Sequence, residues 1–256
     1  MESIQEIKEK FKDIQVQELT TLCEVYKADG RKGVQKLVEQ GQKRIQALKK
    51  EKERLKQMRE FERKYEHLGY VCGIDEVGRG PFAGPVVAGA VILPSDCEIL
   101  YVNDSKQLSE KMREQLYDEI MEKAISVAVG YASPQRIDEI NILQATYEAM
   151  REAVSKLEVT PQILLNDAVT IPQITIPQVP IIKGDAKSIS IAAASIVAKV
   201  TRDHLMREYD KIMPEYGFAS NKGYGSKEHI EAIKKYGPTP IHRRSFIHNV
   251  IGENHE

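Results

Sequence analysis

Four acidic side chains follow short apolar stretches that have the length of buried strands. Asp75 and Glu76 come after 70–74, Asp167 comes after 163–166, and Asp185 comes after 181–184. A charge at the end of a buried strand is costly unless it is paired or bound to a metal. Taken singly, Asp167 could be a turn residue and Asp185 a helix cap. With no competing cluster of His or Cys, the four acids together favour a hard cation such as Mg²⁺ or Mn²⁺.

The glycine-rich segment directly after the first two acids could bind an anion. Its core is Gly78-Arg79-Gly80. The glycine spacing does not match a dinucleotide fingerprint and no helix is expected behind it, which excludes a Rossmann site. Glycines would instead let backbone N–H groups approach a phosphate, with Arg79 making a bidentate contact. A plain tight turn is the alternative. Because successive strand side chains point to opposite faces, Asp75 and Glu76 can share one site only if the strand bends or ends there.

Several basic residues could contact a phosphate backbone. Lys106 and Lys187 each lie beside a serine, and they either position phosphates or belong to solvated faces. The run 242–244, His-Arg-Arg, is expected to be a basic patch that could line a duplex. Asp203 follows Lys199 by four residues, so an ion pair is expected there rather than catalysis. Three histidines lack ligand spacing and are expected in packing or at the surface: His204, His229 and His248.

The elements that must position these residues alternate between strands and helices. Apolar stretches predict paired strands at 70–74 and 86–93 and a further strand at 163–165. Helical patterns cover 109–124, 138–157 and about 188–213. The fold class is therefore α/β.

The first 69 residues differ from the rest in composition. They predict two or three helices interrupted at Asp29-Gly30, and they carry 17 basic against 13 acidic residues. Between 31 and 59 the imbalance is 11 basic to 3 acidic, which would suit a phosphate backbone or a solvated helix face. The chain has 256 residues and three Cys without a C-x-x-C pair, no signal-peptide pattern and no apolar run of about 18 residues. We expect a cytoplasmic protein that engages no membrane.

Five segments then occur in one order and resemble bacterial ribonuclease HII. They are GIDEVGRG (73–80), NDSK (103–106), GDAKS (184–188), AAASIVAKVTRD (192–203) and NKGYG (221–225). The resemblance covers roughly 70–250. It implies a ribonuclease H-like mixed sheet flanked by helices in a catalytic domain at 70–256, with a helical, basic N-terminal extension at 1–69.

The resemblance also implies roles for the residues. Asp75, Glu76, Asp167 and Asp185 match the four catalytic, metal-binding acids of the family. The substrate-binding set comprises Gly78, Arg79, Gly80, Lys106, Lys187 and Tyr224, of which Tyr224 matches a tyrosine that reads the RNA-to-DNA junction. The third acid departs from the family pattern, because a Val-Asp-Gly-like context is replaced by Asn166-Asp167-Ala168.

The implied activity is endonucleolytic. Two Mg²⁺ or Mn²⁺ ions would activate a water and stabilise the leaving 3′-oxygen. The enzyme would cut the RNA strand of RNA–DNA hybrids and DNA at single embedded ribonucleotides, giving 5′-phosphate products, and we expect a monomer. The alternatives are a ribonuclease HIII-like or other carboxylate-dependent nuclease, and a non-catalytic nucleic-acid-binding protein. The intact Gly-Arg-Gly favours type HII over HIII, and four acids without a metal would repel a phosphate backbone.

Overall fold

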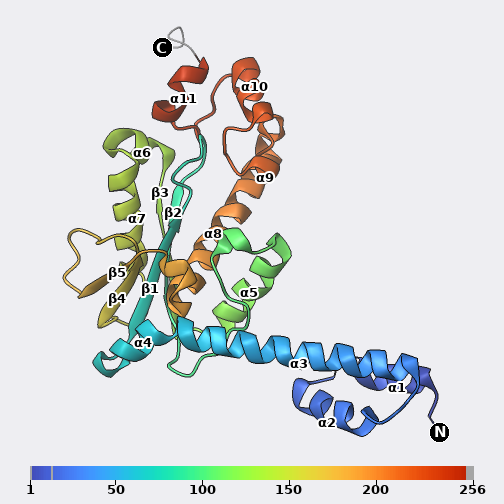
Figure 1. Cartoon of the computed structure of the whole chain (residues 1–256). Coiled ribbons are helices and arrows are strands. Elements are labelled where there is room, and N and C mark those ends of the chain that lie inside the picture. The colour runs from blue at the N-terminus through green and yellow to red at the C-terminus, as the bar shows by residue number, and fades with distance from the viewer. Residues whose placement is uncertain (1, 13, 252–256) are drawn as a thin grey trace. The chain divides into compact units, whose positions relative to one another are not determined.

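The chain forms two compact units. The computed structural model describes residues 2–12 and 14–251, and its first unit ends at Gln57 while the second begins at Met58 (Figure 1). In the described ranges, no helix combines the length and apolarity needed to cross a bilayer.

The first unit consists of helices, as the sequence predicts. They are α1 (Ile4–Phe11), α2 (Val16–Tyr26) and α3 (Lys32–Met58), and the predicted break at Asp29-Gly30 falls between α2 and α3. Ser3 caps α1 by accepting from the Glu6 amide, while the Glu6 carboxylate accepts from the Ser3 amide. The helices pack around a small apolar core that comprises Ile7, Phe11, Leu19, Cys23, Val34 and Val38.

The second unit is built on a mixed five-stranded sheet with the order β3-β2-β1-β4-β5. The central strand β1 is antiparallel to β2 and parallel to β4, β2 is antiparallel to β3, and β4 is parallel to β5. The bounds are β1 (Val71–Val77), β2 (Val86–Ile92), β3 (Ser126–Ala132), β4 (Ile163–Asp167) and β5 (Gln178–Ile181). This is the mixed sheet that the resemblance implies.

Helices cover both faces of this sheet (Figure 1). Helix α8 (Ile189–Ile212) packs on one face and α7 (Ile142–Ser155) on the other. Close approach requires glycine: a Cβ at Gly73 would lie 2.1 Å from the Ser190 carbonyl carbon, and one at Gly130 would lie 2.0 Å from the Ala149 oxygen. Because strand residues alternate, Cys72 and Ile74 join the α7-side core. Asp75 then lies on the α8 face.

Further helices complete this unit. They are α4 (Glu60–Tyr65), α5 (Glu110–Lys123), α6 (Pro134–Ile140), α9 (Phe218–Asn221), α10 (Lys227–Tyr236) and α11 (Arg244–Ile251), with short 3₁₀ turns η1 (Glu66–Leu68), η2 (Ser105–Gln107), η3 (Gly184–Ala186) and η4 (Pro214–Tyr216).

Strand β3 was not predicted, and two of the predicted elements have other bounds in the structure. The single helix predicted over 138–157 is two helices, because Asn141 adopts φ 69° and its side chain caps α7 by accepting from the Leu143 and Gln144 amides. The strand predicted over 70–74 continues to Val77, so Asp75 and Glu76 lie within β1 rather than after it. The continuation from 75 to 77 depends on pairing with β2, which the local sequence does not reveal.

Candidate active site

The first pair of candidate acids lies on adjacent parallel strands. Ile74 of β1 pairs with Asn166 of β4, so the next residues, Asp75 and Asp167, follow side by side where the pairing of the two strands ends. Asp75 is only 4% exposed. Its burial raises the pKa of its carboxyl well above the ordinary range, and the charges of Glu76 and Asp167 raise it further.

Glu76 leaves β1 on the opposite side from Asp75 but remains within electrostatic reach of the site. Burial raises the pKa of its carboxyl, the charge of Asp167 adds to this, and Arg79 opposes it. The Arg79 guanidinium lies 3.5 Å from the Glu76 carboxylate. Asp75 and Glu76 therefore both interact with Asp167 despite the alternation along the strand.

Asp167 and Asp185 are joined through a short turn. The Gly184 amide donates to the Asp167 carboxylate at 2.7 Å, which places the η3 turn and its Asp185 against the end of β4. Ala168, next in sequence, adopts φ 57°. That left-handed conformation favours glycine, which gives a physical reason for the glycine of the family pattern at this position.

Asp185 has a further acidic neighbour that the sequence analysis did not single out. The pKa of the Asp185 carboxyl is raised by burial, then by Asp104 and Asp167, and Lys106 opposes the shift. Asp104 lies within the 103–106 segment that carries the resemblance, so the sequence pattern marked this position, but the sequence analysis assigned Asp104 no role. Asp104 also caps η2 by accepting from the Lys106 amide at 2.9 Å.

The two candidate lysines differ in their relation to the acids. Burial lowers the pKa of Lys106, but the charges of Asp104, Asp75, Asp185 and Asp167 more than offset this, so its pKa is raised. The charge of Lys106 in turn lowers the pKa of Glu76, so Lys106 interacts electrostatically with all four predicted acids. Lys187 is exposed at the end of η3.

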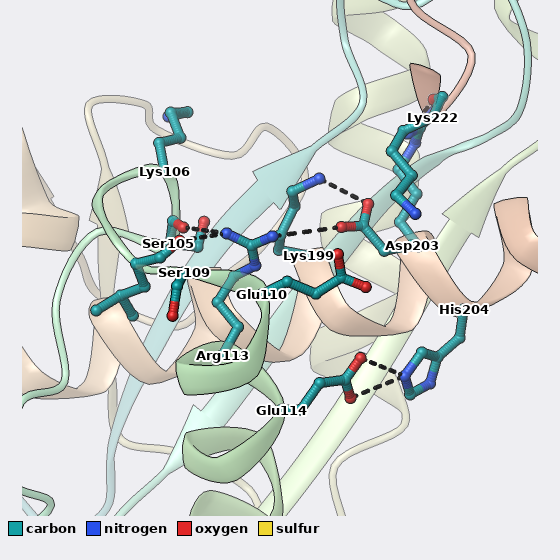
Figure 2. Close-up of polar contacts among 12 residues, drawn as sticks. Ser105, Lys106, Ser109, Glu110, Arg113, Glu114, Lys199, Asp203, His204 and Lys222 are labelled. Atoms are coloured by element: carbon teal, nitrogen blue, oxygen red, sulfur yellow. Dashed lines mark hydrogen bonds and ion pairs between the residues drawn. The ribbon is translucent and has the colours of Figure 1, made fainter. Parts of the chain in front are cut away.

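A buried ion-pair cluster holds the segment that carries Lys106 (Figure 2). Arg113 of α5 donates to the carbonyls of Ser105 at 3.1 Å and Leu108 at 2.6 Å. The Asp203 carboxylate lies 2.6 Å from Lys199 and 3.8 Å from Arg113. Asp203 therefore makes the ion pair predicted for it.

The donor set fits a divalent cation. Carboxylate oxygens are the ligands that Mg²⁺ and Mn²⁺ prefer, and a cation would offset the burial and the like-charge repulsion that raise the pKa values of Asp75, Glu76 and Asp185. Within residues 2–12 and 14–251, three or more acidic, His or Cys side chains nowhere converge at ligand distance. A cation would therefore have to draw these carboxylates closer together.

The two glycines of the Gly-Arg-Gly segment differ in what surrounds them. Gly78 adopts φ 91°, and a Cβ there would lie 2.3 Å from the Arg202 Nε. Gly80 has no such constraint, because the nearest atom to an added Cβ is the Tyr224 Cε1 at 3.8 Å. The fold therefore requires glycine at 78 but not at 80. The same contact places the ring of Tyr224, which is 47% exposed, beside Gly80.

The expected basic patch at 242–244 is wrong for two of its three residues. His242 and Arg243 are buried, and only Arg244 is exposed. The Thr239 amide donates to His242 Nδ1 at 2.9 Å, and His242 Nε2 lies 3.0 Å from His229 Nε2. His229, expected in packing or at the surface, is buried beside it. The sequence run suggested solvent exposure, but contacts with distant segments bury it.

Comparisons with known proteins give the relatives of this chain. The family model described as Ribonuclease HII matches residues 72–249, and that described as Ribonuclease HII N-terminal domain matches 3–66. Ribonuclease HII of Lachnoclostridium phytofermentans is 69% identical over 225 residues, covering 88% of this chain and 89% of the relative. Ribonuclease HII of Clostridioides difficile is 51% identical over 251 residues, covering 97% and 98%.

Solved structures share the fold. Ribonuclease H2 from Pyrococcus horikoshii OT3 superposes with a TM-score of 0.60 at 30% identity, covering 71% of this chain and 97% of that one. Bst-RNase HIII in complex with Mn²⁺ has a TM-score of 0.55 at 17% identity, covering 69% and 67%, and it shows likeness of fold alone.

Proposed function

Because the chain belongs to the ribonuclease HII family and is an RNase H endonuclease that depends on divalent metal ions, we propose that it uses Mg²⁺ or Mn²⁺ to cut RNA–DNA hybrids and DNA at single embedded ribonucleotides. The observation that carries the choice of site is the placement of Asp75 beside Asp167, directly after the last paired residues of two adjacent parallel strands, where burial and mutual repulsion raise the pKa of Asp75. Two buried carboxylates that repel each other destabilise the fold and would repel an anion, whereas a bound cation would stabilise them.

Asp75, Glu76, Asp167 and Asp185 would hold the metal ions. Bound ions would supply an activated water and stabilise the leaving 3′-oxygen. The chain supplies the positions of the acids: the β1–β4 register sets Asp75 against Asp167, and the bond from the Gly184 amide fixes Asp167 relative to the η3 turn. Lys106, close enough to interact with these acids, would position a phosphate entering the site.

The segment at 78–80 would recognise the ribose. Among the described residues, no neighbouring atom prevents a larger side chain at position 80. Glycine there instead allows the backbone to be approached closely by a substrate. The ribose 2′-OH is both donor and acceptor, and backbone groups at this point could bind it. Arg79, 44% exposed along its side chain, would hold the adjacent phosphate.

Tyr224 would recognise the next sugar. Its exposed ring lies beside Gly80, so a sugar placed against Gly80 would have its neighbour over the ring. A deoxyribose lacks the hydroxyl that would hinder such stacking. Tyr224 would therefore favour an RNA-to-DNA step, as at a single embedded ribonucleotide.

The proposal also covers the cellular location, the oligomeric state and the role of the N-terminal extension. We place the enzyme in the cytoplasm as a monomer, and its three cysteines are buried and free, which suits a reducing compartment. The N-terminal extension would add phosphate contacts through exposed lysines of α3 such as Lys36, Lys49 and Lys50.

The test is cleavage of three labelled duplexes that share one sequence. One is all DNA, one contains a single ribonucleotide, and one is an RNA–DNA hybrid. With Mg²⁺ or Mn²⁺ the last two should be cut to 5′-phosphate ends, and with EDTA none should be. Asp75→Asn should abolish cleavage but keep duplex binding, because an amide keeps the shape and loses the charge that holds a cation. Glu119→Gln, which neutralises an acid paired with Lys123 on α5, is the matched control and should cut normally.

Binding without cleavage in both metals would favour a non-catalytic nucleic-acid-binding protein. Normal cleavage by Asp75→Asn would refute the assigned site while leaving the activity intact.

A further inference from the structure

Two arginines in the second unit are buried without an acidic partner. Arg202 of α8 and Arg243, directly before α11, are both 0% exposed. In the part of the chain that the structure describes, neither guanidinium has a carboxylate within ion-pair distance. Burial lowers the pKa of Arg202 to about 10 and that of Arg243 to about 9, and the charge of Arg202 contributes to the latter. Burying two neighbouring cations is costly, so their contacts need a reason other than stability.

Every hydrogen bond that Arg243 donates ends on the loop that follows β1. Its Nη2 donates to the Gly78 carbonyl at 2.5 Å, and its Nη1 donates to the Arg79 carbonyl at 2.9 Å. The Gly84 carbonyl accepts from Nε at 3.0 Å and from Nη2 at 2.8 Å. Arg243 therefore binds the first two residues of the Gly-Arg-Gly segment and the far end of the same loop at once.

Arg202 holds the neighbouring part of the loop and joins it to the segment that carries Tyr224. It donates to the carbonyls of Ala83 at 3.0 Å and Pro85 at 3.0 Å, and to that of Lys222 at 2.8 Å. The Phe82 amide adds a backbone bond to Gly223 at 2.8 Å. The loop at 78–85 and the segment at 222–224 are thus fixed relative to each other from the inside.

The direction of the carbonyls determines the direction of the amides. In a planar trans peptide, the C=O of one residue and the N–H of the next point in opposite directions. Since the carbonyls of Gly78 and Arg79 point inward to Arg243, the N–H groups of Arg79 and Gly80 point outward. Among the described residues, neither amide meets an acceptor. These two donors lie next to the Gly80 surface and the Tyr224 ring.

We propose that Arg243 is a positioning residue for cleavage at a ribonucleotide: by holding the carbonyls of Gly78 and Arg79, it directs the N–H groups of Arg79 and Gly80 toward the ribose. The inference rests on the proposed function. Donors fixed in place before the substrate arrives need no reorganisation during the reaction, which is where such groups contribute most. A guanidinium suits this role because its planar fork donates in several directions, whereas a lysine ammonium is a compact point charge.

The experiment compares Arg243→Lys with the wild type on the single-ribonucleotide duplex. A second variant, Arg243→Gln, keeps a planar amide and tests the proposal if the lysine variant does not fold. Met150→Ala, a core substitution on the α7 side of the sheet, controls for lowered stability. We expect the Arg243 variants to lose about tenfold or more in kcat, with unchanged affinity for the all-DNA duplex. Amide hydrogen exchange of Phe82, Ala83 and Gly84 should accelerate, while exchange in β3 stays slow.

Other outcomes overturn the inference. Normal kcat in both Arg243 variants would show that the loop needs no such support. A loss equal to that of Met150→Ala at matched melting temperature, or a loss without faster exchange at 82–84, would reduce Arg243 to a packing residue. If the wild type itself does not cut at a ribonucleotide, the proposed function fails, and exchange alone then decides whether Arg243 holds this loop.

Discussion

The two glycines flanking Arg79 separate what the fold requires from what a substrate requires. Alanine at 78 would adopt a positive φ and place its Cβ 2.3 Å from the Arg202 Nε. Alanine at 80 would meet only the Tyr224 ring, at 3.8 Å, which is ordinary van der Waals contact. One extra methyl group at two nearby positions should therefore have opposite consequences for stability and activity.

The size of the stability effect follows from these contacts. A non-glycine residue in the left-handed region costs about 1–2 kcal/mol. Overpacking a buried site costs about 1–3 kcal/mol more. Together the two costs come to about 2–5 kcal/mol. For a unit of this size each kcal/mol corresponds to about 2–4 °C in melting temperature, so Gly78→Ala should melt roughly 4–20 °C lower. Gly80→Ala should change stability by less than about 0.5 kcal/mol.

The activity of Gly80→Ala should fall although its fold is intact. Its methyl group would occupy the space proposed for the ribose, and a displacement of about 1 Å can cost about 100-fold in rate. Gly217→Ala is the matched control, because Gly217 lies in the left-handed region with φ 64° and ψ 36°, and an added Cβ there would meet only the Asn221 Nδ2 at 3.6 Å, an ordinary contact. It should show the cost of the backbone conformation alone.

The assay is a melting curve and a single-turnover cleavage rate for each of the three variants. Normal cleavage by Gly80→Ala would refute the close approach of substrate at Gly80. A Gly78→Ala melting temperature no lower than that of Gly217→Ala would refute the collision with Arg202.

Four further predictions test other parts of the molecule. Asp185→Asn should abolish cleavage in Mg²⁺ yet not lower the melting temperature in EDTA, because it removes a carboxyl whose pKa burial and neighbouring acids raise; lower stability would contradict this. Tyr224→Ala should slow cleavage at a single ribonucleotide more than in a uniform hybrid, and equal losses with a lower melting temperature would indicate a packing role. Deleting 1–57 should leave a folded, active second unit, and a plot of its log affinity for the duplex against log salt concentration should be less steep. Deleting 1–69 should also lower stability, because α4 packs against the sheet of that unit. Finally, burial lowers the pKa of His242 from 6.5 to about 4. Because the unfolded chain then binds a proton that the folded chain excludes, the free energy of unfolding should fall as pH drops from about 6.5 to 4. Urea unfolding at pH 7 and 4.5 should show a smaller fall for His242→Gln.

Local signals in the sequence were sufficient for much of the fold and for the identity of the candidate acids. The helix predicted over 109–124 is observed as α5 because Ser109 caps it within its own turn. The helix predicted to begin near Ser188 is α8, which Ser188 caps in the same way. Asp75, Asp167 and Asp185 were recognisable because each follows an apolar stretch. Caps and apolar runs act over a few residues, so a single sequence reveals them.

The tertiary structure alone decided which residues face one another. The register of β1 on β4 sets Asp75 beside Asp167, and contacts between 104 and 185 add Asp104 to the site. Arg243 looked like part of an exposed basic run, yet it is buried against carbonyls more than 150 residues away in the chain. Its burial depends on a loop whose backbone oxygens turn inward, and the glycines of that loop do not reveal which distant side chain those oxygens meet. Burial and strand register arise from contacts between distant segments, which is why the sequence by itself could not determine them.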